Sequence, residues 1–192
     1  AAVPDAEAEA LKLDLAKARY LQAETIVEDA ALRLAEPEAL TEAQRILRSV
    51  LTTFDQIGIA VHRRVEVLEA QEERGRLDAD EAGRAALAEA RRLRSLAHYY
   101  AGWSRYYLAS VAANPSIARE ALVDFGWLLN ASPGDPATVD RLPRALLKYE
   151  HIARAAMGCA LAASLQGASV DALRWLEEVD SSEELSPAVR DQ

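Results

Sequence analysis

Apolar residues near the start of the chain recur at steps of three and four, the spacing that places side chains on one stripe of an α-helix. Every second member of this stripe is alanine; in order they are Leu13, Ala16, Tyr20, Ala23, Val27, Ala30 and Leu34. Alanines between large residues allow a neighbouring helix to approach closely and its side chains to interdigitate. The pattern predicts a long first helix, ending where Glu36-Pro37 interrupts it.

A second amphipathic segment follows this interruption. Thr41-Glu-Ala-Gln44 has the form of a capping box, which predicts the start of a helix. Apolar residues then recur at sevens, with others between them: Leu47, Val50, Phe54, Ile57, Val61, Val65 and Leu68. This seam resembles that of a coiled coil and predicts a helix ending near Gly75.

A third long helix is expected after a cap at Asp78. Its stripe consists of Ala86, Ala90, Leu93, Ala97, Tyr100, Ser104, Tyr107 and Val111. The large and small members again alternate, so this helix too is expected to pack against other helices.

The second half of the chain is divided into shorter segments by turn-forming residues. The expected elements are a helix from Asn114-Pro115 to Leu129, a loop at Ser132–Pro136, a helix from Pro136 or Pro143 to Gln166-Gly167, a helix capped by Ser169, and a further start at Ser186-Pro187. Short connections require that consecutive helices pack as antiparallel neighbours.

Composition agrees with an all-α fold. The chain is rich in Ala, Leu, Glu and Arg, has only 8 Gly and 7 Pro, and lacks alternating Val/Ile/Thr runs. At 192 residues it can form one domain, or two small ones sharing a continuous core. We expect a single all-helical domain over 1–192, with a long hairpin at 1–75 and shorter hairpins at 76–192.

Charge and hydropathy exclude two classes of partner. The net charge of −9 argues against nucleic acid, because Lys and Arg must neutralise phosphates there. The basic runs Arg63–Arg64 and Arg91–Arg94 are interleaved with acids such as Glu66 and Glu89, as on a solvated helix face. No run approaches the ~18 apolar residues of a membrane span, so none is expected.

No residue pattern indicates catalysis, a cofactor or a metal. The three histidines, His62, His98 and His151, lie far apart and have no metal-ligand spacing. Cys159 lies in an apolar segment and is interpreted as a small core residue. We therefore expect no catalytic, cofactor-binding or metal-binding residue and a protein that is not an enzyme, although an enzyme or ligand carrier with a site between helices stays an alternative.

The start of the chain bears on localisation. It begins Ala-Ala-Val-Pro, and small residues flank the cleavage sites of signal peptides. This favours an exported protein, periplasmic or extracellular, over a cytoplasmic one; a trimmed sequence is the alternative. Asn130-Ala131-Ser132 is a formal glycosylation sequon, but Pro133 follows it directly.

Aromatic residues are concentrated in one part of the chain: seven of the eleven lie between Tyr99 and Trp127. Tyr100, Trp103 and Tyr107 share one helix face, whereas Tyr99 and Tyr106 share the adjacent face. One reading is a wide core contact between the third, fourth and fifth helices. The other is an interface, because Tyr and Trp dominate binding hot spots. The candidate interface residues are Tyr99, Trp103, Tyr106 and Trp127.

Residues from about 96 to 180 resemble tetratricopeptide repeats. The matching residues are Ala101-Gly102 in one helix, Ala121, Phe125, Leu128 and Pro133 around the next, Met157-Gly158 and Leu161, then Ala172, Leu176 and Val179. In that family, small residues allow the two helices of a hairpin to touch. The resemblance implies stacked antiparallel hairpins, an α-solenoid, and a role in protein–protein interaction.

The first hypothesis for function is a non-enzymatic helical-repeat scaffold that also assembles with copies of itself into a ring or filament. The first helical hairpin carries apolar residues away from its main stripe: Leu11, Leu15, Leu21, Ile26 and Leu32. Contact between unlike ends of a stacked array would produce such assemblies. The alternative is a tetratricopeptide-like receptor that binds a different protein, or an extended ligand, through an aromatic groove.

Overall fold

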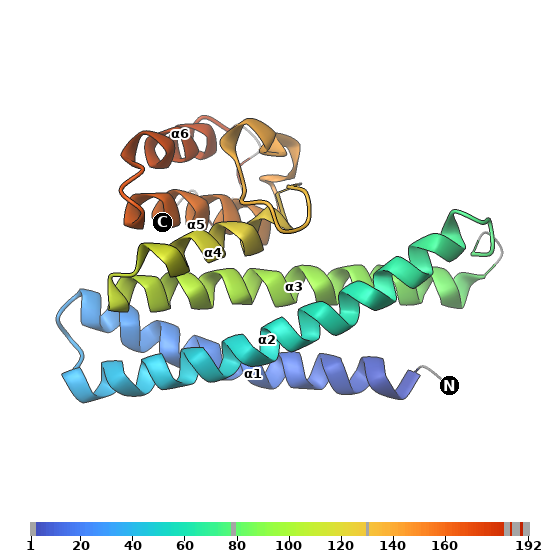
Figure 1. The fold of residues 1–192 in the computed structure, drawn as a ribbon, viewed down its shortest axis with the longest axis horizontal. Coiled ribbons are helices and arrows are strands. Elements are labelled where there is room, and N and C mark those ends of the chain that lie inside the picture. Colours follow the sequence, from blue (N-terminus) through green and yellow to red (C-terminus); the bar gives the residue numbers. More distant parts are fainter. Residues whose placement is uncertain (1–2, 78–79, 130, 183–184, 186–188, 190–192) are drawn as a thin grey trace.

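A computed structural model describes residues 3–77, 80–129, 131–182, 185 and 189 of the chain (Figure 1). Over these residues the secondary structure is helical, without a strand. The elements are α1 (Val3–Ala31), α2 (Pro37–Glu72), α3 (Glu81–Ala112), α4 (Pro115–Gly126), the 3-10 turns η1 (Val139–Arg141) and η2 (Arg144–Leu146), α5 (Glu150–Leu165) and α6 (Ser169–Asp180). The expected all-α fold class is confirmed.

The three long helices form one layer and the three short ones are stacked on it. α2 runs diagonally from the level of α1 to that of α3, and α4, α5 and α6 follow beyond α3 (Figure 1). α3 is central, because it packs against α1 and α2 on one side and against α4 and α5 on the other. No helix among the described residues is long and apolar enough to cross a membrane.

The core of the long layer consists of the stripes that the sequence predicts. Leu13, Tyr20 and Val27 of α1 are buried, and so are Phe54 and Val61 of the α2 seam. The end of the first stripe is an exception: α1 ends at Ala31, and Leu34 beyond it is 73% exposed.

The start of α2 differs from the prediction. The helix begins at Pro37, with Glu36 in extended backbone before it, whereas the sequence suggested a start at Thr41. Proline is tolerated in the first helical turn because the N–H it lacks would have no partner there. Pro37 therefore starts the second helix as well as separating it from the first, and the Thr41 hydroxyl donates to the Pro37 carbonyl.

The cap of α3 is Asp80, whose carboxylate accepts a hydrogen bond from the backbone N–H of Gly83 at 2.9 Å. The expected cap, Asp78, lies outside the described residues. The predicted stripe is also shifted at its start, because Ala86 is exposed and Leu87 is buried. From Ala90 onward the predicted positions are buried or half-buried.

The connection from α4 to α5 is where the sequence-based prediction is wrong. α4 begins at the predicted Asn114-Pro115 cap but ends at Gly126, and residues 136–149 form two 3-10 turns rather than a helix. Ala137 donates its backbone N–H to the Leu122 carbonyl. Val139, Leu142 and Leu147 are buried and pack against the hydrophobic core of the short helices. This packing keeps the segment ordered, although its prolines prevent it from forming an α-helix.

A second core lies among the short helices, and Phe125 of α4 is fully buried in it. Its ring fills the space beside two glycines. A Cβ on Gly102 of α3 would lie 2.7 Å from the ring, and a Cβ on Gly158 of α5 would lie 2.6 Å from it. Only glycine fits at both positions, so the Phe125 ring packs directly against the backbones of α3 and α5 and holds α4 to both helices.

Candidate functional site: a groove floored by aromatic side chains

A groove runs along α3 between α1 and α5. Two neighbouring clefts form it, with volumes of about 290 and 300 Å³, and Arg154 of α5 lines both. The residues that line the two clefts all come from these three helices. We call this feature the α3 groove.

The floor of the α3 groove is aromatic. Trp103 and Tyr106 line the first cleft and Tyr99 lines the second. The rings touch one another edge-on: the centroids of Trp103 and Tyr106 are 5.6 Å apart, and those of Tyr99 and Trp103 are 6.5 Å apart. All three are half-buried and pack against both hydrophobic cores, so the floor of the groove also joins the two layers.

The first cleft is acidic on its α1 side. The Tyr107 hydroxyl, which has one proton to donate, lies 2.8 Å from Oε1 of Glu28 and 3.1 Å from Oε1 of Glu24, and Tyr20 donates to Glu24 at 2.5 Å. No Lys or Arg of the described chain forms an ion pair with either glutamate. Burial raises the pKa of Glu24 and the charge of Glu28 adds to this shift, whereas the tyrosine hydrogen bonds and the charge of Arg154 oppose it.

The second cleft is mixed in charge. Arg154 pairs with Glu150 of its own helix, with 3.0 Å between Nε and Oε1. Lys17 of α1 places its ammonium 5.8 Å from the centre of the Tyr100 ring, within the range of a cation–π contact. Burial lowers the pKa of His151, which lines the same cleft. The groove thus changes from mixed to acidic along its length.

The fourth candidate from the sequence, Trp127, lies outside the α3 groove. Its ring stacks on His98 at 4.5 Å, meets the edge of His62 at 5.0 Å and lies under Arg94 at 5.5 Å. These partners come from α2 and α3, so Trp127 packs beside the α2–α3 pair. Nearness in sequence grouped it with the other three aromatics, but the fold separates it from them.

A partly buried ionic network, which was not predicted from the sequence, adjoins Trp127. Asp124, which is 7% exposed, accepts a hydrogen bond from Arg105 and lies 3.0 Å from Nδ1 of His98. Arg105 also donates two hydrogen bonds to Asp55 of α2, at 3.0 and 3.1 Å. One signal was present: His98 and Arg105 are seven apart, which places them on the same face of α3.

The charges in this network act on one another. Burial lowers the pKa of Arg105, but the charges of Asp124 and Asp55 outweigh it and raise that pKa overall. Burial raises the pKa of Asp55, against the opposing charge of Arg105. Arg105 is therefore held as a cation among three carboxylates, those of Asp124, Asp55 and the more exposed Glu120, an arrangement that joins α2, α3 and α4.

Other reactive groups do not gather into a centre. In the described ranges no three His, Cys, Asp or Glu side chains are placed to hold a metal ion. Cys159 is fully buried, and burial raises the pKa of its thiol well above the ordinary value. A thiol in this environment stays protonated at neutral pH, which leaves it a poor nucleophile.

Comparison with known proteins gives no relative for this arrangement: no family model, no curated protein and no solved structure matches the chain.

Proposed function

We propose that this chain is a non-enzymatic scaffold for protein–protein interaction and that it receives a segment of a partner protein in the α3 groove. The observation that carries the proposal is the placement of Tyr99, Trp103 and Tyr106 along the floor between two helical walls. Aromatic side chains provide large contact areas at low entropic cost, which is why they dominate protein interfaces.

The order of the helices supports a tetratricopeptide-like interpretation. The groove is lined by α1, α3 and α5, the first helices of three successive hairpins, whereas α2, α4 and α6 lie outside it. Gly102 and Gly158, two small residues in the resemblance, are the positions that contact Phe125. In repeat proteins such stacking creates an extended concave surface for partners.

The groove also suggests the chemistry of the partner segment. Its floor favours apolar or aromatic side chains, and its acidic cleft favours a basic residue, because Glu24 and Glu28 have no ion-pair partner in the described chain. A segment with one or two apolar residues next to a lysine or arginine fits both features.

A display library of peptides with this pattern would test the proposal. The wild-type chain should enrich a common sequence, and the enriched peptide should perturb tryptophan fluorescence on titration. Ser110→Arg places a long side chain in the acidic cleft from an exposed position and should weaken binding at least about tenfold. The matched control is Ala60→Arg, also an exposed helical position but on α2, which should bind as the wild type does.

The two variants make the outcome decisive. Because both positions are exposed, the helical content and thermal unfolding of both variants should match the wild type. Enrichment that survives Ser110→Arg would place the binding surface elsewhere, and a library that enriches nothing would overturn the proposal.

A further inference from the structure

Two apolar surfaces at opposite ends of the helix stack are left uncovered. The first is on α1, where Leu11 and Leu15 lie one turn apart and are 72% and 65% exposed. They point away from the stripe that contains Leu13 and Ala16, so neither α2 nor α3 covers them. We call these two residues the leucine row.

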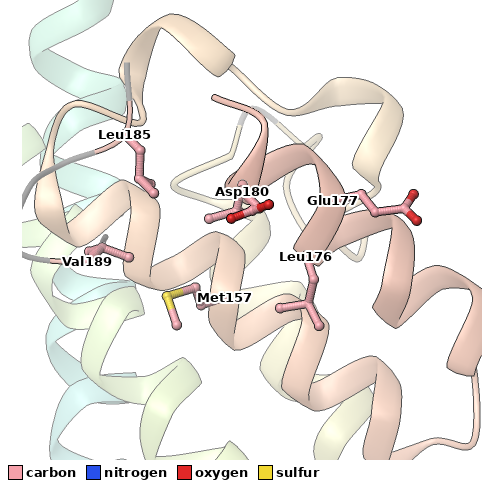
Figure 2. Close-up of a pocket in the computed structure, with 7 residues that line it drawn as sticks. Met157, Leu176, Glu177, Asp180, Leu185 and Val189 are labelled. Carbon is pink, nitrogen blue, oxygen red and sulfur yellow. The ribbon is translucent and has the colours of Figure 1, made fainter. Parts of the chain in front are cut away.

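The second surface is a cleft of about 570 Å³ beside α5 and α6, which we call the end cleft. Figure 2 shows Met157 of α5 and Leu176 of α6 on its floor, with Leu185 and Val189 along one side. Leu176 is 44% exposed, and Val170 and Leu173 continue the apolar surface along α6. The end cleft is large enough to receive apolar side chains from another helix.

The charges next to these surfaces have opposite signs. Exposed Lys12 and Arg19 lie along one flank of the leucine row, and neither forms an ion pair within the described residues. Exposed Glu177 and Asp180 form the rim of the end cleft and are likewise without ion-pair partners there. A basic flank beside two leucines matches an acidic rim beside an apolar floor.

We infer that the leucine row of one copy of this chain docks into the end cleft of the next copy. Leu11 and Leu15 would enter the cleft as anchors one helical turn apart, with Lys12 and Arg19 against Glu177 and Asp180. The contact joins two different surfaces, so each copy keeps one free surface of each kind. Association of this type continues into open filaments, or closes into a ring if the rotation between copies permits.

This assembly is independent of partner binding in the α3 groove, since neither the leucine row nor the acidic rim lines that groove. Met157 lines both the end cleft and the acidic cleft, and it is left unchanged in every test variant. Ser110→Arg should therefore assemble as the wild type does, which separates failure of one proposal from failure of the other.

Sedimentation velocity of the full chain over a wide concentration range provides the first test. The wild type should form a growing series of oligomers. Leu11→Glu/Leu15→Glu removes the leucine row, Leu176→Glu blocks the end cleft, and each should weaken association at least about tenfold. The control Ile59→Glu/Val67→Glu alters two other exposed apolar positions, on α2, and should assemble normally.

Mixing the two blocked variants is the decisive experiment. Each variant keeps one intact surface, and the two surfaces are complementary, so an equimolar mixture should form a one-to-one dimer and nothing larger. A blocked variant that still assembles alone, or a mixture that stays monomeric, would overturn the inference. So would a wild type that remains a monomer at every concentration.

A charge exchange tests the orientation of the contact. Lys12→Glu/Arg19→Glu should weaken assembly, and so should Glu177→Lys/Asp180→Lys, because each places like charges together. A chain carrying all four changes restores opposite charges across the contact and should assemble again. This exchange is more informative than added salt, which also relieves the repulsion between copies of net charge −9. If the chain with all four changes does not assemble, the proposed pairing of the basic flank with the acidic rim is excluded.

Discussion

Asp124 and Phe125 are neighbours in α4, and they hold this helix to α3 in opposite ways. Phe125 fills a space that exists only because Gly102 and Gly158 have no side chains. Asp124 binds the charged group of Arg105 and lies against His98. The first attachment depends on shape alone, and the second on the pairing of charges removed from water.

The two attachments should respond differently to mutation. A fitted apolar contact loses stability in proportion to the volume removed or added. A buried ion pair loses most when one partner is left alone, and much less when both are replaced by apolar groups.

Replacing Phe125 should break the shape-dependent attachment. Phe125→Ala leaves a cavity between α3 and α5 and should lower the free energy of unfolding by about 3–5 kcal/mol. Urea unfolding followed by circular dichroism measures this loss.

The fit between Phe125 and the glycines can be tested by a mutant cycle. Gly158→Ala places a Cβ against the Phe125 ring and should cost about 1–3 kcal/mol in the wild-type background. In the Phe125→Ala background the same change meets no ring and should cost less. Equal costs in both backgrounds would mean that the ring does not set the requirement for glycine.

Replacing Arg105 should break the charge-dependent attachment. Arg105→Met leaves Asp124 buried without its main counter-charge and should lower the free energy of unfolding by about 2–3 kcal/mol. Adding Asp124→Leu removes the stranded carboxylate, so the double variant should be more stable than Arg105→Met alone. A double variant whose loss equals the sum of the two single losses would contradict this account.

Trp127 stacks on His98 beside the charged attachment. Trp127→Ala should reduce the free energy of unfolding by about 1–2 kcal/mol through lost ring contacts. Trp127→Phe keeps an aromatic face and should recover part of that loss. Peptide binding in the α3 groove should be unchanged in both variants. A loss of peptide binding would show that Trp127 belongs to the binding interface.

Glu24 is a half-buried carboxylate that forms no ion pair in the described part of the chain, in contrast to Asp124. Burial raises the pKa of Glu24 above its ordinary 4.5, so the folded state holds the proton more tightly than the unfolded state. Stability should therefore fall as the pH rises through the interval between these two pKa values. Glu24→Gln keeps an oxygen acceptor for both tyrosines but cannot ionise.

Urea unfolding of both proteins at a series of pH values from 4 to 7 measures this effect. The Glu24→Gln variant should gain stability relative to the wild type as the pH rises. A constant difference between the two proteins would show that Glu24 does not titrate differently on folding.

The elements with one buried face were predictable from sequence. Leu13 and Tyr20 of α1, and Phe54 and Val61 of α2, were placed correctly because a single buried stripe has a clear period. The segment 136–149 was not, since prolines indicate where a helix is excluded without specifying which 3-10 turns replace it.

The candidate site was only partly predictable. Tyr99, Trp103 and Tyr106 follow helical spacing, so their common place on α3 could be inferred, although the helices that wall the groove leave no local signal. The Arg105 network could not be inferred, because Asp55 and Asp124 approach from two other helices. Trp127 was grouped with the groove residues because it is near them in sequence. It follows α4, which turns back against α3, so nearness in sequence does not place it in the groove.

The central position of α3 has a kinetic consequence. α3 makes extensive contacts with its neighbours in sequence, α2 and α4, and with the next helices on either side, α1 and α5. Chains whose contacts are local in sequence close few long loops on the way to the native state, and they fold quickly. We expect α2 and α3 to pair first and the outer helices to add in turn, so that α6 can open and close while the centre stays folded.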